Sequence, residues 1–200
     1  MAKYIVGAIA LVLIILAGYY AWQYESTPVT PPPPPPPPSS TYATSTFSIA
    51  YPSSFLLDDT YAYDQFEGKP VAGVQFMIPI SMTEGTNLSS DTYLSVEWLP
   101  RAKQCTGDIF IVPNVKPFEF AVGSTTYSVA TTTGAAAGNI YEEQVFAVEG
   151  SKPCTAVRYF IHSGNIGNYP SEGEGAVTEF NRATLFREFD SIRDALVLSP

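Results

Sequence analysis

Hydrophobic and polar residues alternate through most of the chain after residue 41. In the stretch TFSIAYP, Phe47, Ile49 and Tyr51 fall on one side of an extended chain. A period of two is typical of a strand with one buried face. The stretches VAGVQFMIPI and TYLSVEWL have the same period, with the apolar sets Val74, Phe76, Ile78 and Ile80, and Leu94, Val96 and Trp98. In the second stretch Tyr93, Ser95 and Glu97 take the opposite side. The pattern predicts three strands.

Two further strand pairs are predicted between residues 118 and 162. The stretch FEFAVGSTTYSVAT has Gly123-Ser124 at its centre, which predicts a hairpin with a two-residue turn of the II′ kind. TTTGAAAGN then turns the chain. NIYEEQVFAV and CTAVRYFIH form the next pair, joined around Glu149 to Pro153. In the last strand Arg158, Phe160 and His162 share a face.

The C-terminal stretch NRATLFREFDSIRDALVL changes to a helical period. Leu185, Phe189, Ile192 and Leu196 recur at spacings of four, three and four, and Asn181 is placed to cap the helix. The opposite face carries Arg182, Arg187, Asp190, Arg193 and Asp194. A shorter helical turn is predicted near Leu88 to Asp91. The fold class is therefore α+β: an antiparallel β-sheet with a C-terminal amphipathic helix packed on it.

Residues 1–24 are predicted to form a single transmembrane anchor. Tyr4 to Trp22 carries no charge and no proline, and as a helix it would span about 28 Å. Lys3 precedes the stretch and the first acidic residue, Glu25, follows it, which favours a cytoplasmic N-terminus and an external C-terminus. A cleaved signal peptide is the alternative. We favour the retained anchor because no clear small-x-small cleavage site ends the stretch.

Residues 25–41 are predicted to be a proline-rich linker. Pro31 to Pro38 is an uninterrupted run of eight prolines, which imposes the polyproline II form over about 25 Å. The alternatives are a stiff spacer and a docking site for a proline-binding module. We favour the spacer, since such modules act mostly inside eukaryotic cells. It would place residues 42–200, the α+β domain, in the periplasm or outside the cell.

Two resemblances are carried by short stretches. FSIAYPSSF at the start of the domain and FDSIRDALVLS at its end resemble the PsbP-like α/β/α sandwich domains, over about residues 46–199. This resemblance implies a binding or accessory role more than an enzymatic one. AAAGNIYEE and CTAVRYFIHSGN resemble uncharacterised bacterial membrane-anchored envelope proteins, a resemblance that implies no activity.

Charge excludes one class of partner. The formal net charge is −9, and all 19 acidic residues follow residue 24. An acidic domain is repelled by phosphate backbones, so no nucleic acid partner is expected. The expected partners are the membrane, through the anchor, and another envelope protein.

Cys105 and Cys154 are the only cysteines, and both fall in the external domain. An even count in an oxidising compartment predicts a disulfide. The alternative is a nucleophilic thiol paired with His162, the single histidine. Cys154 and His162 lie eight residues apart on one predicted strand, too far apart to share a proton, whereas the spacing leaves a pair of Cys105 with His162 open. No catalytic residue, metal ligand or cofactor is assigned.

The stretch SGNIGNYPSEGEGAV, residues 163–177, has no periodicity. Long loops of this composition are often contact surfaces. We predict that it binds a ligand or partner through His162, Asn165 and Tyr169; the alternative is a plain crossover into the final helix. The expected function is a membrane-anchored extracytoplasmic binding or accessory module. The alternatives are an envelope hydrolase using His162 and a purely structural envelope protein.

Overall fold

The computed structural model describes residues 15–16, 19–20 and 38–199. Ile15, Leu16, Tyr19 and Tyr20 are helical; the rest of the predicted anchor and the prolines before Pro38 lie outside the described residues. Within the described part of the chain no helix is long and apolar enough to cross a membrane. Residues 38–199 all belong to one compact unit, and the first strand begins at Ser39, inside the predicted linker.

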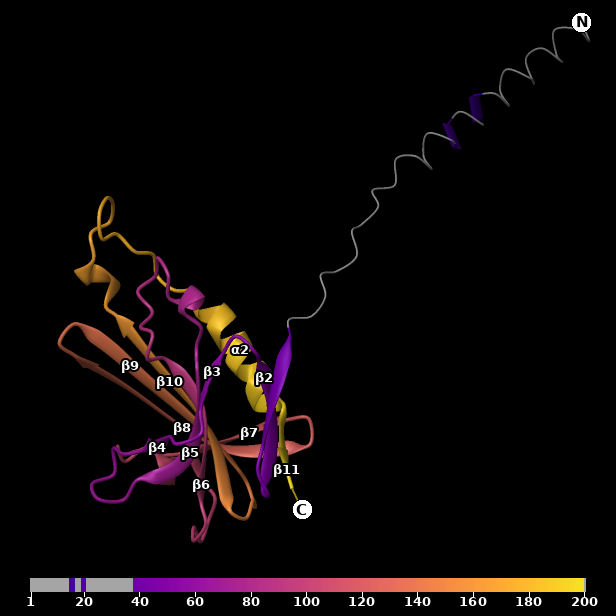
Figure 1. The fold of residues 1–200 in the computed structure, drawn as a ribbon, viewed down its shortest axis with the longest axis vertical. Helices are drawn as coiled ribbons and strands as arrows, with labels where there is room; N and C mark the ends of the chain where they lie inside the picture. Colours follow the sequence, from indigo (N-terminus) through magenta and orange to yellow (C-terminus); the bar gives the residue numbers. More distant parts are fainter. Residues whose placement is uncertain (1–14, 17–18, 21–37, 200) are drawn as a thin grey trace, which may run out of the picture. The chain divides into compact units, whose positions relative to one another are not determined.

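The larger of two sheets has eight strands in the order β3-β5-β6-β10-β9-β8-β7, with β4 paired to β5 (Figure 1). Every neighbouring pair is antiparallel. The strands are β3 (Leu56–Asp58), β4 (Ala62–Tyr63), β5 (Val71–Met77), β6 (Tyr93–Leu99), β7 (Phe118–Val122), β8 (Thr125–Ala136), β9 (Asn139–Val148) and β10 (Cys154–Gly164). The predicted antiparallel sheet is confirmed.

A second sheet has three strands in the order β1-β2-β11. These are β1 (Ser39–Ala43), β2 (Phe47–Pro52) and β11 (Leu196–Leu198). The sequence pattern identified only the middle strand. Strands β1 and β11 flank β2 and so bring the start and the end of the described domain together. In the antiparallel pair of β11 with β2, Leu198 lies opposite Phe47.

Two tight turns connect the longest strands. Gly123 and Ser124 connect β7 to β8. Gly123 has a φ of +57° and Ser124 does not have a positive φ, and a II′ turn requires a positive φ at its first central residue only. The next turn is much shorter than predicted. Ala137 and Gly138 alone reverse the chain, with φ of 50° and 84°, while Thr131 to Ala136 continue β8. β-branched threonines favour the extended strand over a loop.

Helix α2 (Arg182–Asp194) packs where the sequence predicts. Leu185, Phe189 and Ile192 are buried, and α2 and the three-stranded sheet cover the same face of the large sheet (Figure 1). We call this the helix-covered face. Two details of the prediction are wrong. The helix ends at Asp194, so Leu196 belongs to β11, and Arg193 is buried at 4% exposure.

Arg193 can be buried because two carboxylates and an aromatic ring interact with its positive charge. Its guanidinium donates to Asp190 and Asp194 at 2.8 and 2.9 Å. Its Cζ also lies 4.7 Å from the ring centroid of Phe146. The helical pattern placed Arg193 on the polar side, but the ring of Phe146 and two carboxylates accommodate it inside.

The cap of α2 gives a direct stability prediction. Asn181 Oδ1 accepts a hydrogen bond from the Thr184 backbone N–H at 3.0 Å. We expect Asn181→Ala to lower the free energy of unfolding by about 1 kcal/mol, because one amide at the helix start loses its partner. Asn181→Ser, which keeps a capping oxygen, should lose much less. Urea unfolding of the three proteins measures both values, and equal losses would contradict the capping role.

Three short 3-10 helices complete the described domain: η1 (Ile80–Met82), η2 (Gly107–Phe110) and η3 (Ile166–Asn168). Near the predicted helical turn at Leu88 to Asp91 the structure has one hydrogen-bonded turn, in which the Thr92 N–H donates to the Ser89 carbonyl at 3.1 Å, and Leu88 forms an isolated bridge to Ser163. Ile80 was predicted to continue an apolar strand face. It lies in η1 and is 64% exposed.

The second face of the large sheet is covered by η2 and connecting segments, so we call it the loop-covered face. Its apolar core is smaller and consists of Tyr63, Val71, Phe110, Ile111, Ala130, Val145, Ala147, Cys154 and Ala156. Gly107 in η2 shows how closely this layer packs, because a Cβ there would lie 2.6 Å from the Ala130 nitrogen. Polar residues beside this core form the candidate site.

Candidate functional site: a tyrosine pocket over a buried ion network

Three charged side chains meet on the loop-covered face. Glu97 comes from β6, Arg158 from β10 and Glu143 from β9, which are neighbours in the sheet. Arg158 Nε donates to Glu97 Oε1 at 2.7 Å, and its Nη2 donates to Glu97 Oε2 at 2.8 Å. Nη1 donates to Glu143, and Nη2 also donates to the Phe110 carbonyl. The guanidinium is therefore paired on every nitrogen.

This ion network is buried to an unusual degree. The side chains of Arg158 and Glu97 have no exposed surface, and Glu143 keeps 16%. Burial alone would lower the pKa of Arg158, but the carboxylates of Glu97 and Glu143 raise it more, so its pKa lies above the usual value. The arginine stays charged, and the bidentate geometry compensates for the water that both groups have lost.

Three tyrosines extend the network. Tyr61 donates its hydroxyl to Glu97 at 3.2 Å and lies 3.0 Å from the Tyr93 hydroxyl. Tyr63 donates to Glu143, and its ring lies 3.6 Å from the Arg158 Cζ atom. Burial raises the pKa of Tyr93 to about 12, and burial followed by the charge of Glu97 raises that of Tyr61. Near neutral pH these hydroxyls are protonated donors.

Gly73 on β5 makes room for this arrangement. A Cβ at this position would lie 2.9 Å from the Val96 carbonyl oxygen and 3.0 Å from the Tyr61 ring. Gly73 also donates its backbone N–H to the Tyr61 carbonyl at 3.1 Å. The missing side chain therefore lets the segment before β4 lie against β5 and directs Tyr61 toward Glu97.

A cavity of about 350 Å³ opens beside the network. We call it the tyrosine pocket, and its lining residues are Tyr61, Ala62, Tyr63, Asp64, Gln65, Tyr93, Tyr141, Glu143 and Phe160. The Tyr93 and Phe160 rings stack with centroids 4.9 Å apart. A concave, mostly apolar surface with a few converging polar groups is the usual form of a small-ligand site.

His162 lies next to the tyrosine pocket without lining it. Its ring stacks on Tyr141 with centroids 4.4 Å apart. Its Nδ1 lies 2.7 Å from Asp91 Oδ1, and its Nε2 is buried with no hydrogen-bond partner among the described residues. The imidazole therefore supports a wall of the pocket through Tyr141.

Asn165 and Tyr169 are held in the loop after β10. Asn165 caps η3 by accepting from the Gly167 N–H at 3.0 Å, and its own N–H donates to the Gly138 carbonyl. Tyr169 is 37% exposed. Neither lines the tyrosine pocket. The prediction that His162, Asn165 and Tyr169 form a contact surface stays a prediction.

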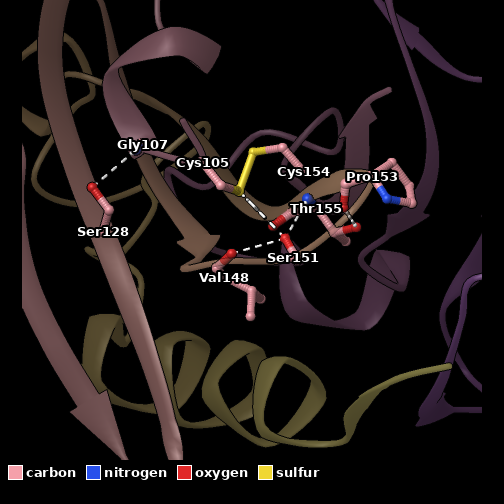
Figure 2. Close-up of a disulfide and its surroundings, with 8 residues drawn as sticks. All are labelled: Cys105, Gly107, Ser128, Val148, Ser151, Pro153, Cys154 and Thr155. Carbon is pink, nitrogen blue, oxygen red and sulfur yellow. Dashed lines mark hydrogen bonds between the residues drawn. A yellow bond between two sulfur atoms is a disulfide. The ribbon is translucent and has the colours of Figure 1, made fainter. Parts of the chain in front are cut away.

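The predicted disulfide between Cys105 and Cys154 is confirmed, with Cα atoms 5.1 Å apart (Figure 2). Cys154 is the first residue of β10, and Cys105 lies in the segment after β6. Ser151 organises the junction, donating to the Val148 carbonyl and accepting from the Thr155 N–H (Figure 2). Since neither cysteine is free, the alternative of a thiol nucleophile is wrong.

No metal centre is formed by the described side chains: residues 15–16, 19–20 and 38–199 contain no group of three or more His, Cys, Asp or Glu placed to hold an ion. The acidic pair at residues 58 and 59 serves a turn, since Asp58 Oδ1 accepts from the Thr60 N–H at 2.9 Å.

Comparison with known proteins adds no assignment. No model of a protein family matches the chain, and no curated protein matches it. The resemblance to PsbP-like domains accordingly stays a prediction. Any functional conclusion must come from the geometry of the domain itself.

Sequence reasoning missed the tyrosine pocket, although two signals for it were present. Glu97 is the only charged residue of the stretch TYLSVEWL, and Arg158 is the only arginine, lysine or acidic residue of CTAVRYFIH. Opposite charges in two buried strands would each require a partner. Only the pairing of β6 with β10 shows that they are partners of each other.

Proposed function

We propose that the protein is a membrane-anchored extracytoplasmic binding module whose ligand occupies the tyrosine pocket. The observation that carries this proposal is a cavity of about 350 Å³, lined by five aromatic residues and backed by an ion network in which every nitrogen of the Arg158 guanidinium is paired. A pocket whose walls are fixed by buried hydrogen bonds is pre-organised, which reduces the entropy lost on binding.

The placement outside the cytoplasm has two supports. The apolar stretch Tyr4 to Trp22 has the length and the flanking charges of an anchor, and the proline run after it would separate the domain from the bilayer. The disulfide between Cys105 and Cys154 is the kind of bond that persists in an oxidising compartment.

A binding role fits the described groups better than catalysis. His162 is directed to Asp91 and Tyr141 rather than to a hydroxyl or thiol nucleophile. The acidic groups of the ion network are neutralised in part by Arg158. The geometry therefore supports recognition of a ligand, with His162 in a supporting position.

The proposal is tested by ligand-observed NMR on the full chain with a set of neutral, anionic and cationic fragments. We expect hits that Tyr141→Ala weakens by about tenfold, the size of one lost aromatic contact in a desolvated pocket. The matched control is Tyr169→Ala, which removes the predicted loop contact and should leave binding unchanged. Sensitivity to Tyr169→Ala alone would assign binding to the loop, and an absence of hits would overturn the proposal.

A further inference from the structure

We infer that the ligand of the tyrosine pocket is a small organic cation, an alkylated ammonium group in particular. This inference rests on the proposed function, because it specifies the chemistry of the same site. Three features carry it: an unbalanced negative charge, a lining without basic residues, and hydroxyl groups already used inside the protein.

The charge imbalance follows from counting the network. Glu97 and Glu143 contribute two formal negative charges, and Arg158 contributes one positive charge, so one negative charge is left over. Glu143 is the partly exposed member and lines the tyrosine pocket. A cation entering beside it would complete the pairing of that carboxylate away from bulk water, where the attraction is stronger than at the surface.

The pocket has nothing that would attract an anion. Its nine lining residues include the acidic Asp64 and Glu143 but no lysine, arginine or histidine. Arg158 has no exposed surface, and its donors are taken by Glu97, Glu143 and the Phe110 carbonyl. The nearest positive charge is thus unavailable to a ligand.

The pocket is also poorly equipped for a neutral polyol. Such ligands are held by free donors and acceptors, but the hydroxyls of Tyr61 and Tyr63 donate inward to Glu97 and Glu143. The lining consists of five aromatic side chains, the carboxylates of Asp64 and Glu143, the Gln65 amide and Ala62. Aromatic rings attract cations through their negative faces, and a fully alkylated, quaternary ammonium has no N–H and so needs no hydrogen-bond acceptor. The same chemistry could come from a free small molecule or from a lipid headgroup.

The decisive comparison uses two probes of nearly the same shape. Choline carries a trimethylammonium group, and 3,3-dimethylbutan-1-ol replaces that group by a neutral tert-butyl group. With the full chain in an uncharged polyoxyethylene detergent, calorimetry or NMR titration should show choline binding at least about tenfold more tightly. Equal affinities would overturn the inference about charge while leaving the pocket as a binding site. Absence of binding by choline and by every fragment would overturn both proposals.

Two variants locate the charge. Glu143→Gln removes the unbalanced carboxylate, keeps a hydrogen-bond acceptor for Arg158, and should weaken choline binding by about tenfold. Glu142→Gln is the matched control. It lies on the same strand with the same 16% side-chain exposure, but it pairs with Arg182 of α2 on the helix-covered face. Unchanged choline binding in Glu143→Gln, or an equal loss in both variants, would overturn the assignment.

Vesicles identify the source of the cation. Phosphatidylcholine vesicles that compete with choline, while phosphatidylglycerol vesicles do not, would show that the group is presented by a lipid headgroup. Choline binding without competition by either vesicle would show that the group belongs to a free small molecule. Both results support the cation, and competition by the anionic vesicles alone would overturn it.

Discussion

Replacing Arg158 with Met should lower the free energy of unfolding by about 3–5 kcal/mol, among the largest effects expected from a single change in this domain. The side chains of Arg158 and Glu97 are completely buried, and the guanidinium holds both oxygens of that carboxylate. Without the arginine, Glu97 is left as an unpaired charge inside the sheet, and the Phe110 carbonyl loses a donor. Guanidinium chloride unfolding of the full chain measures the loss.

Two comparisons decide whether the lost charge pairing is the cause. Adding Glu97→Gln to Arg158→Met should recover at least about 2 kcal/mol, because the amide removes the buried charge but still accepts from Tyr61 and Ser95. Arg182→Met is the surface control. Arg182 pairs with Glu142 at 49% side-chain exposure, so its loss should cost under about 1 kcal/mol. Equal costs at positions 158 and 182 would contradict the importance of burial.

Removing the disulfide should cost about 4 kcal/mol. Cys105 and Cys154 are 49 residues apart in the sequence. Closing a loop of that length lowers the entropy of the unfolded chain, and the resulting rise in its free energy is about 4 kcal/mol. The double variant Cys105→Ala/Cys154→Ala is compared with the unchanged protein in denaturant, with and without a reductant. Reduction should destabilise the unchanged protein and leave the double variant unaffected. A midpoint that is insensitive to reductant in both would contradict this prediction.

The redox state of the protein from its native source tests the proposed compartment. Alkylation under denaturing conditions should label neither cysteine until the protein is reduced, after which the intact mass should show two labels. That result fits an oxidising compartment and an extracytoplasmic domain. Two labelled thiols without reduction would contradict both the bridge in the native protein and the proposed location.

One face of β10 connects stability with the proposed binding site. Cys154, Arg158, Phe160 and His162 all lie on the loop-covered face, since successive residues of a strand alternate between its sides. The disulfide fixes the start of the strand, Arg158 fixes its centre, and Phe160 lines the tyrosine pocket. We therefore expect Arg158→Met to disturb the pocket wall at Phe160 as well as to lower stability, whereas Arg182→Met should affect neither strongly.

Much of the fold could be predicted because it depends on local patterns. The period of two placed Leu94 and Val96 on one side of β6 and Glu97 on the other. Gly123 identified a hairpin, and Asn181 identified the start of α2. These features depend on neighbouring residues in the sequence, whose backbone geometry and side-chain direction are fixed within a few positions.

The errors occurred where distant contacts outweighed a local preference. Leu196 fitted the helical stripe of α2, but pairing with Ile49 of β2 makes it part of a strand. Arg193 fitted the polar side of the helix, but Phe146 and two carboxylates enclose it. Packing contributes more free energy than the propensity of one residue, so tertiary partners decided both positions.

By itself, then, the sequence determined the strand faces, the capped helix, the pairing of two lone cysteines and the apolar and proline-rich composition of residues 1–41. The tertiary structure decided the order of the strands and, through it, the tyrosine pocket. A pattern shows which side chains share a face of one strand, but not which strands lie side by side. Glu143 and Arg158 lie on the strand pair that the sequence predicts, but Glu97 is 61 residues from Arg158, and only the pairing of β6 with β10 brings its charge into contact with theirs.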